Sequence, residues 1–172
     1  MVMGRDELVS ALFSETDRAQ RMRTPLALIE VGIDGCGLES GRNCCDEAVE
    51  KIVGRIRRLL RCYDTVGRMA EEELAIVLPG CTTFNAKTLA ERVRDEVFRS
   101  PVTACGTTRL NACYGVAGSG GRSPFVVMQE VERALRSAKA KGSGAIVCAS
   151  QEADMDLVAF LMPVSGDESL RW

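Results

Sequence analysis

Three consecutive glutamates, Glu71, Glu72 and Glu73, stand out in this chain of 172 residues. They lie between "DTVGRMA" and "LAIVLPG", and the second stretch is typical of a buried strand that ends in a turn. Two interpretations of this run of like charge are open. The glutamates either form the solvated tip of a hairpin, or they supply carboxylates to a site that binds metal and phosphate.

The composition limits the kinds of partner. Hydrophobic residues make up 46% and charged residues 27%, which is enough to build the core of one domain. The formal net charge of -2 argues against nucleic acid, because binding to phosphate backbones requires a basic surface. No apolar run reaches the roughly 18 residues that span a bilayer, and "MVMGRDELVS" lacks the apolar core of a signal peptide. We therefore expect a cytoplasmic protein with no nucleic-acid or membrane partner.

The chain has eight cysteines and no histidine. The cysteines are scattered without a CxxC pair, so they predict small, partly buried thiols and neither disulfides nor a zinc site. Without histidine, any catalysis would depend on carboxylates, lysine or metal.

Hydrophobic periodicity predicts four helices and five strands. The helices are expected over residues 5–22, 46–60 and about 83–98, and over a segment whose apolar face runs from 127 to 138. The strands are expected over 26–31, 65–69, 74–80, 109–117 and 144–150, with a glycine-rich loop at 35–45.

The order of these elements indicates the fold class. Helices alternate with strands, but the strands at 65–69 and 74–80 form a tight hairpin, which excludes a purely parallel sheet. We predict an α+β fold, with a central mixed β-sheet, a ferredoxin-like βααββαβ core and flanking helices. Residues 1–150 should form this domain, and residues 151–172 a C-terminal tail or linker.

Several blocks together resemble the GGDEF domain of the diguanylate cyclase family. They are "PLALIEVGID", "CDEAVEKIVGRIRRLLRCYDTVGRMAEEELAIVLPG", "AERVRDEVF", "ACYGVA" and "ALRSAKAKGSGAIV", in the family's order across roughly residues 5–149. Active members of this family bind one GTP per subunit and join two of them into cyclic di-GMP through two metal ions. The resemblance therefore implies a role in bacterial cyclic di-GMP signalling.

The family's Gly-Gly-Asp/Glu-Glu-Phe hairpin falls on "AEEEL", which begins at Ala70. Glu72 matches the metal-binding acid, and Glu73 matches the acid beside it. Both glycines, which the family uses to bring nucleotide close to the backbone, are replaced. Glu71, in the second glycine position, places a negative charge where the triphosphate would lie. Like charges a few ångström apart in a partly desolvated site repel by several kcal/mol in rough Coulomb terms.

Other positions of the nucleotide site are also altered. Gly32 stands where the family has an aspartate that holds both metals, and Gly37 where it has a lysine that neutralises phosphate. Asp46 matches the guanine-reading aspartate, and Lys139 matches a phosphate-binding lysine, whose arginine companion is replaced by Ser143.

These differences predict a GGDEF domain without catalytic activity. Glu72 is only a weak metal candidate, because one carboxylate cannot hold two divalent ions, and a solvent-exposed hairpin glutamate is the preferred interpretation. We expect no cofactor, and Mg²⁺ or Mn²⁺ only if GTP is bound. Two alternatives are a weakly active diguanylate cyclase and a GTP-binding regulatory domain of a GGDEF–EAL phosphodiesterase.

One further motif of the family is retained. Arg61 and Asp64, in "RCYD", match its inhibitory Arg-x-x-Asp site for cyclic di-GMP, and Arg92 matches the second arginine of that site. An arginine fork can bond phosphate or a guanine edge, and the aspartate can accept from guanine. An ordinary surface ion pair is the competing interpretation. The implied partners are cyclic di-GMP, a second copy in a homodimer, and an EAL or other signalling domain, for which this domain would act as a regulatory or dimerisation module.

Overall fold

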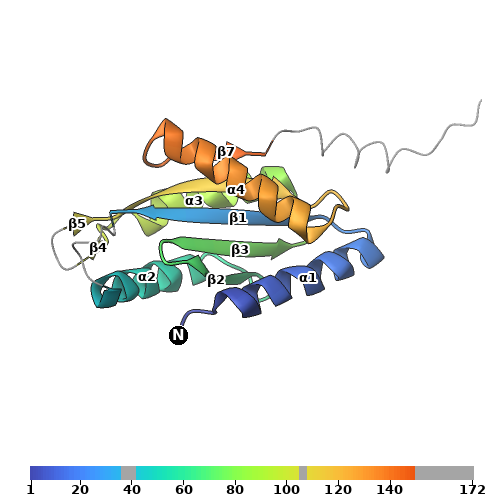
Figure 1. Cartoon of the computed structure of the whole chain (residues 1–172), viewed down its shortest axis with the longest axis horizontal. Coiled ribbons are helices and arrows are strands. Elements are labelled where there is room, and N and C mark those ends of the chain that lie inside the picture. Colours follow the sequence, from blue (N-terminus) through green and yellow to red (C-terminus); the bar gives the residue numbers. More distant parts are fainter. Residues whose placement is uncertain (36–41, 105–107, 150–172) are drawn as a thin grey trace, which may run out of the picture.

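A computed structural model describes residues 1–35, 42–104 and 108–149 (Figure 1). The helices are α1 (Arg5–Met22), α2 (Arg42–Arg57), α3 (Thr83–Val97) and α4 (Pro124–Lys141). The strands of the main sheet are β1 (Leu26–Asp34), β2 (Thr65–Ala70), β3 (Glu73–Pro79), β6 (Asn111–Gly118) and β7 (Ile146–Cys148). The strands β4 (Thr103–Ala104) and β5 (Thr108–Arg109) form a separate two-stranded sheet.

The main sheet has the strand order β2-β3-β1-β6-β7. All neighbours are antiparallel except β6 and β7, which are parallel and connected through α4. The order β1–α2–β2–β3–α3–β6 gives a ferredoxin-like core, to which α4 and β7 are added at one edge. The predicted α+β fold with a mixed sheet is confirmed. Between β1 and β2, the described residues contain one helix, α2.

The boundaries of α2 differ from the prediction. The helix begins at Arg42, inside the predicted glycine-rich loop, and the acid expected to open it, Asp46, bonds Arg68 of β2 instead. It ends at Arg57 because the N–H groups of Leu59 and Leu60 bond to carbonyls three residues back, which tightens the last turn. The small β4–β5 sheet was not predicted, since two-residue strands carry no periodicity.

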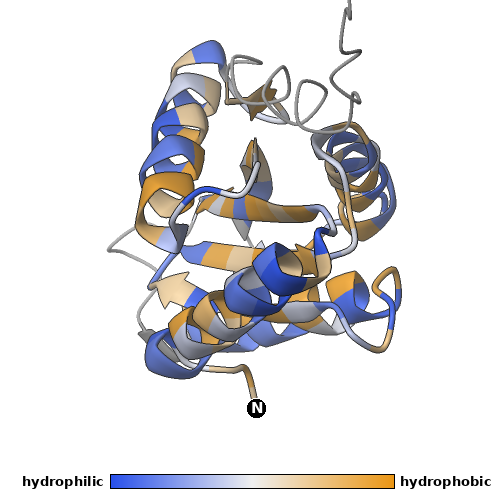
Figure 2. Ribbon diagram, turned by 90° about the vertical axis from the view of Figure 1, so that its right-hand side faces the viewer, coloured by the Kyte–Doolittle hydropathy of each residue, from blue (hydrophilic) through white to orange (hydrophobic). Residues whose placement is uncertain are grey.

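The helices cover both faces of the sheet. Leu8 and Leu12 of α1 and Val127 and Val131 of α4 pack on one face, with Leu28 of β1. The apolar residues of α2 and α3 pack on the opposite face, where the larger part of the core lies. Figure 2 shows the strands largely in orange, with the outer sides of the helices in blue. On the α1–α4 face, the last turn of α4 reaches the glutamate hairpin and one end of β1.

Gly115 of β6 lies against the backbone of α4. A Cβ on this residue would come within 2.5 Å of the Val131 carbonyl oxygen and 2.6 Å of the Leu135 nitrogen, both backbone atoms of α4. Gly115→Ala should therefore lower the free energy of unfolding by about 2 kcal/mol, as expected for overpacking that a side chain cannot relieve. Urea denaturation measures the difference. Gly54→Ala is the matched control, because a Cβ there meets nothing within 4 Å and should stabilise α2 by about 0.5–1 kcal/mol.

The predicted tail, residues 151–172, lies outside the described residues. Among the described residues, Cys45, Cys62, Cys81 and Cys113 are free thiols. Within the described segments, no helix combines the length and apolar content needed to cross a membrane.

Candidate functional site

The predicted hairpin is present, and its turn consists of Glu71 and Glu72. Ala70 pairs with Glu73 at the end of the β2–β3 ladder, so only these two residues connect the strands. Both are exposed. Arg23 alone among the described non-glycine residues has a positive φ, so the turn does not require glycine for its backbone conformation. The hairpin therefore forms without the family's glycines.

The space above Gly32 is occupied by the side chain of Lys139. A Cβ on Gly32 would lie 2.7 Å from Lys139 Cε, and the Lys139 Nζ donates to Glu73 Oε1 at 2.8 Å. This hydrogen bond is the main cause that raises the pKa of Lys139 above its ordinary value. The turn is tied to the same end of β1, where the Ile33 N–H donates to the Glu72 carbonyl at 2.8 Å. The absent side chain at Gly32 thus allows a lysine of α4 to reach a hairpin acid.

Asp46, the predicted guanine reader, is also held by a partner within the protein. Arg68 Nη1 of β2 donates to Asp46 Oδ1 at 2.7 Å, and the Arg68 side chain is partly buried. Asp46 and Lys139, which the sequence assigned to nucleotide, are therefore each engaged by a residue of opposite charge. Gly37, where the family's phosphate lysine is missing, lies outside the described residues.

Glu30 is a buried carboxylate that the sequence analysis did not select. It lies on β1, two residues before Gly32, and only 4% of the residue is exposed. Burial, followed by the charges of Glu73 and Glu132, raises the pKa of Glu30 from 4.5 to about 7, against the lowering effect of Lys139. Its Oε2 atom is buried without a hydrogen-bond partner. The signal in the sequence was a single acid inside the apolar run "LALIEVGI".

Arg61 and Asp64 form one closed turn after α2. The backbone N–H of Arg61 donates to Asp64 Oδ2 at 2.8 Å, and the N–H of Asp64 donates to the Arg61 carbonyl at 3.1 Å. The guanidinium is exposed, bonds the Tyr63 hydroxyl at 2.9 Å and has its Cζ 5.9 Å from the Tyr63 ring centre. Arg92 is in α3, and its Nε lies 3.8 Å from Oε1 of Glu96 in the same helix. Arg61 and Asp64 are thus hydrogen-bonded to each other, while Arg92 forms its ion pair with Glu96 of its own helix.

Comparison with known proteins gives the family. Residues 2–145 match the family described as "Diguanylate cyclase, GGDEF domain". The chain belongs to the GGDEF diguanylate cyclase family. It is a GGDEF domain of cyclic di-GMP signalling, as the resemblance of its sequence blocks had indicated.

Individual GGDEF proteins resemble the chain in sequence and in structure. The response regulator PleD of Caulobacter vibrioides is 29% identical in an alignment of 112 positions that covers 62% of this chain and 25% of PleD. The active GGEEF domain of a diguanylate cyclase from Vibrio cholerae has a TM-score of 0.76 at 24% identity, over 88% of this chain and 100% of that one. The GGDEF domain of DgcB from Caulobacter crescentus, solved with c-di-GMP, has a TM-score of 0.74 at 21% identity, over 87% and 89%. This chain thus spans about a quarter of PleD.

GGDEF cyclases use Mg²⁺ or Mn²⁺ with GTP, but the described residues of this member do not fit such a pair of metals. Gly32 supplies no carboxylate, and Lys139 carries a positive charge into the space that one would fill. Glu73 is bound to that lysine. No group of three or more acids, cysteines or histidines with metal-binding geometry occurs in the described ranges. The donor set on β1 and the hairpin is therefore incomplete for two-metal chemistry.

Proposed function

We propose that this GGDEF domain does not synthesise cyclic di-GMP and instead binds it as a receptor, through Arg61, Asp64 and Arg92. The main support for a loss of synthesis is the Lys139–Glu73 ion pair above Gly32. The lysine occupies the space that the side chain of a metal-binding acid would fill. Two divalent ions brought there would meet an ammonium group and lack a bridging carboxylate. Glu71, exposed at the turn, adds a negative charge that repels a triphosphate.

The Arg61–Asp64 turn supports binding of the dinucleotide. Asp64 fixes the backbone of Arg61 and leaves the guanidinium on the surface, where it can form paired hydrogen bonds to phosphate or to a guanine edge. The half-exposed Tyr63 ring beside it offers a stacking surface for a purine. The likeness to the DgcB domain, solved with c-di-GMP, supports the same ligand class for this chain.

Assembly is a further part of this proposal. A ligand with two guanines and two phosphates can bridge the Arg61 turns of two copies, so binding should be accompanied by dimerisation. We propose that the domain regulates a second signalling domain, with an EAL domain as the first candidate.

Titration calorimetry with cyclic di-GMP tests this function. The protein should give binding heat, and Arg61→Ala should weaken the affinity at least about tenfold, the usual cost of losing a charge-assisted hydrogen bond. Arg18→Ala, which removes an exposed arginine of α1, should bind like the unmodified protein. Light scattering should show dimers only with ligand. Absence of heat from the unmodified protein, or equal binding by Arg61→Ala, would contradict the assignment.

A further inference from the structure

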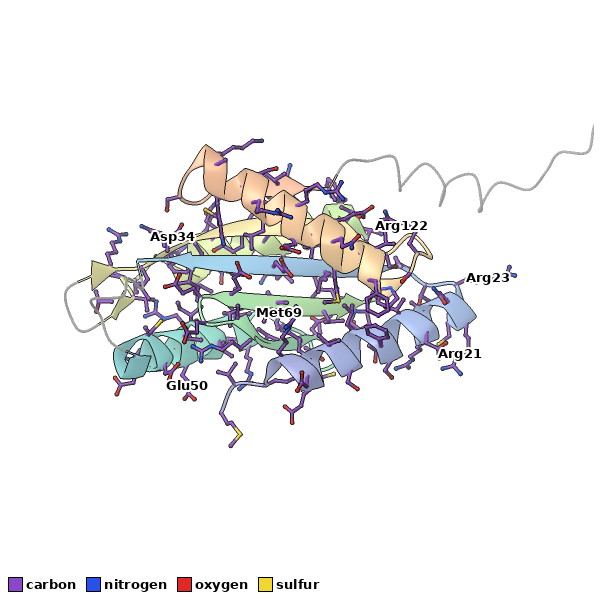
Figure 3. The ribbon with its side chains drawn as sticks, in the orientation of Figure 1. Arg21, Arg23, Asp34, Glu50, Met69 and Arg122 are labelled. Carbon is purple, nitrogen blue, oxygen red and sulfur yellow. The ribbon has the colours of Figure 1, made fainter. Side chains whose placement is uncertain are left out.

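A cavity of about 370 Å³ opens between the N-terminus of α1, the β2–β3 hairpin and α4. Its polar lining consists mainly of Glu30 from β1, Glu73 from β3, Glu132 from α4 and Arg5 from α1. Phe125 and Met128 of α4 and Met69 of β2 add apolar surface. Figure 3 shows Met69 in the region between β3 and α1. The Arg61 turn follows α2, a helix of the opposite face, so this cavity is separate from the proposed cyclic di-GMP site.

Glu30 is the feature that points to a ligand. It is 96% buried, it lines the cavity, and its Oε2 has no hydrogen-bond partner. Buried carboxylate oxygens are normally satisfied, because an unpaired one loses its hydration without compensation. Glu73 already accepts a hydrogen bond from Lys139. Glu132 is exposed, and its Oε1 lies 3.8 Å from Nη2 of Arg136 on the same helix. Glu30 therefore remains the unsatisfied acceptor of the cavity.

The charges and surfaces define the class of ligand. With all three carboxyl groups ionised, they face Arg5 and the nearby Lys139 and leave a net charge of -1 at the cavity. One cationic group would balance that charge and donate to Glu30. The two methionines and Phe125 would contact an alkyl chain, and the Phe125 ring would also attract the cation. We propose that this cavity binds a small organic cation with one alkylammonium or alkylguanidinium group, held by Glu30.

A bare metal ion fits the cavity less well. The described residues contain no group of three acids placed to coordinate one ion. The cavity is also much larger than an ion with its first ligand shell, and part of its wall is apolar.

Calorimetric titration with n-butylguanidinium and n-butylammonium tests the proposal, with butan-1-ol as a neutral compound of similar size. At least one cation should bind, butan-1-ol should not, and Glu30→Gln should weaken cation binding by about tenfold or more. Glu132→Gln, at the exposed rim, should have a smaller effect. Glu47→Gln, which removes an exposed acid of α2 on the other face of the sheet, should leave the affinity unchanged.

Each outcome is decisive for this site alone. Loss of binding in Glu30→Gln with full binding in Glu47→Gln supports the assignment. No heat with either cation at millimolar concentration, equal binding of butan-1-ol, or unchanged binding by Glu30→Gln overturns it. Cyclic di-GMP titrations of the same variants keep the two proposals apart, since Glu30→Gln should retain binding of the dinucleotide.

Discussion

Incubated with GTP and either Mg²⁺ or Mn²⁺, the protein should form no detectable cyclic di-GMP at concentrations where an intact cyclase converts all the substrate. The reaction needs two metal ions held by carboxylates near the nucleotide phosphates. Here Gly32 offers none, and Lys139 fills that space while it binds Glu73. Loss of such a ligand should lower the rate by at least about a thousandfold, and chromatography of the reaction mixture measures the product.

Restoring the aspartate alone should not restore turnover. In Gly32→Asp the new Cβ would lie 2.7 Å from Lys139 Cε, the far end of a flexible side chain, which can move aside. The introduced carboxylate would then pair with the Lys139 ammonium rather than with metal. The charge of Glu71 and the missing cation at Gly37 also remain. Product made by the unmodified protein and abolished in Glu72→Ala would refute the loss of activity.

Strong sequence patterns predicted the fold well. Long amphipathic helices such as α1 and α3 were found within one residue of their ends, because their apolar residues recur every three or four positions. The hairpin was found because two β-prone runs flank a charged turn. Strand β1 extends to Asp34, three residues beyond the prediction, since Gly32 and Asp34 look like loop residues until their pairing with β6 is known.

The site was predicted only as a set of altered positions. The sequence shows that Gly32 lacks a side chain, but it does not show that Lys139, more than a hundred residues later, fills the space. The sequence likewise does not show that Asp46 pairs with Arg68. Such ion pairs depend on the packing of α4 and β2 on their neighbours. In the sequence Glu30 is only one acid inside an apolar run, and its burial follows from the approach of both α1 and α4 to one face of β1.

The burial of Glu30 makes stability depend on pH. Its pKa is about 7 in the folded protein and 4.5 as the reference for the unfolded chain. Between these values the folded state binds more protons than the unfolded state, so the free energy of unfolding falls as pH rises from about 4.5 to about 7, and is then constant. At about 1.4 kcal/mol per pKa unit, the ionised carboxylate costs up to about 3 kcal/mol above pH 7.

Glu30→Gln removes this ionisation and keeps the shape of the side chain. The variant should resemble the unmodified protein in stability near pH 4.5 and become the more stable of the two as pH rises, by up to about 3 kcal/mol at pH 8. Urea denaturation at several pH values measures the difference, and Glu47→Gln serves as the control for removing one exposed negative charge.

A second variant tests the cause of the pH dependence. The Lys139 ammonium lowers the pKa of Glu30, so Lys139→Met should raise that pKa further and extend the fall in stability to higher pH. The double variant with Glu30→Gln should lose this extension, because the titrating group is gone. A difference between Glu30→Gln and the unmodified protein that stays constant from pH 4.5 to 8 would show that Glu30 ionises normally in the folded protein.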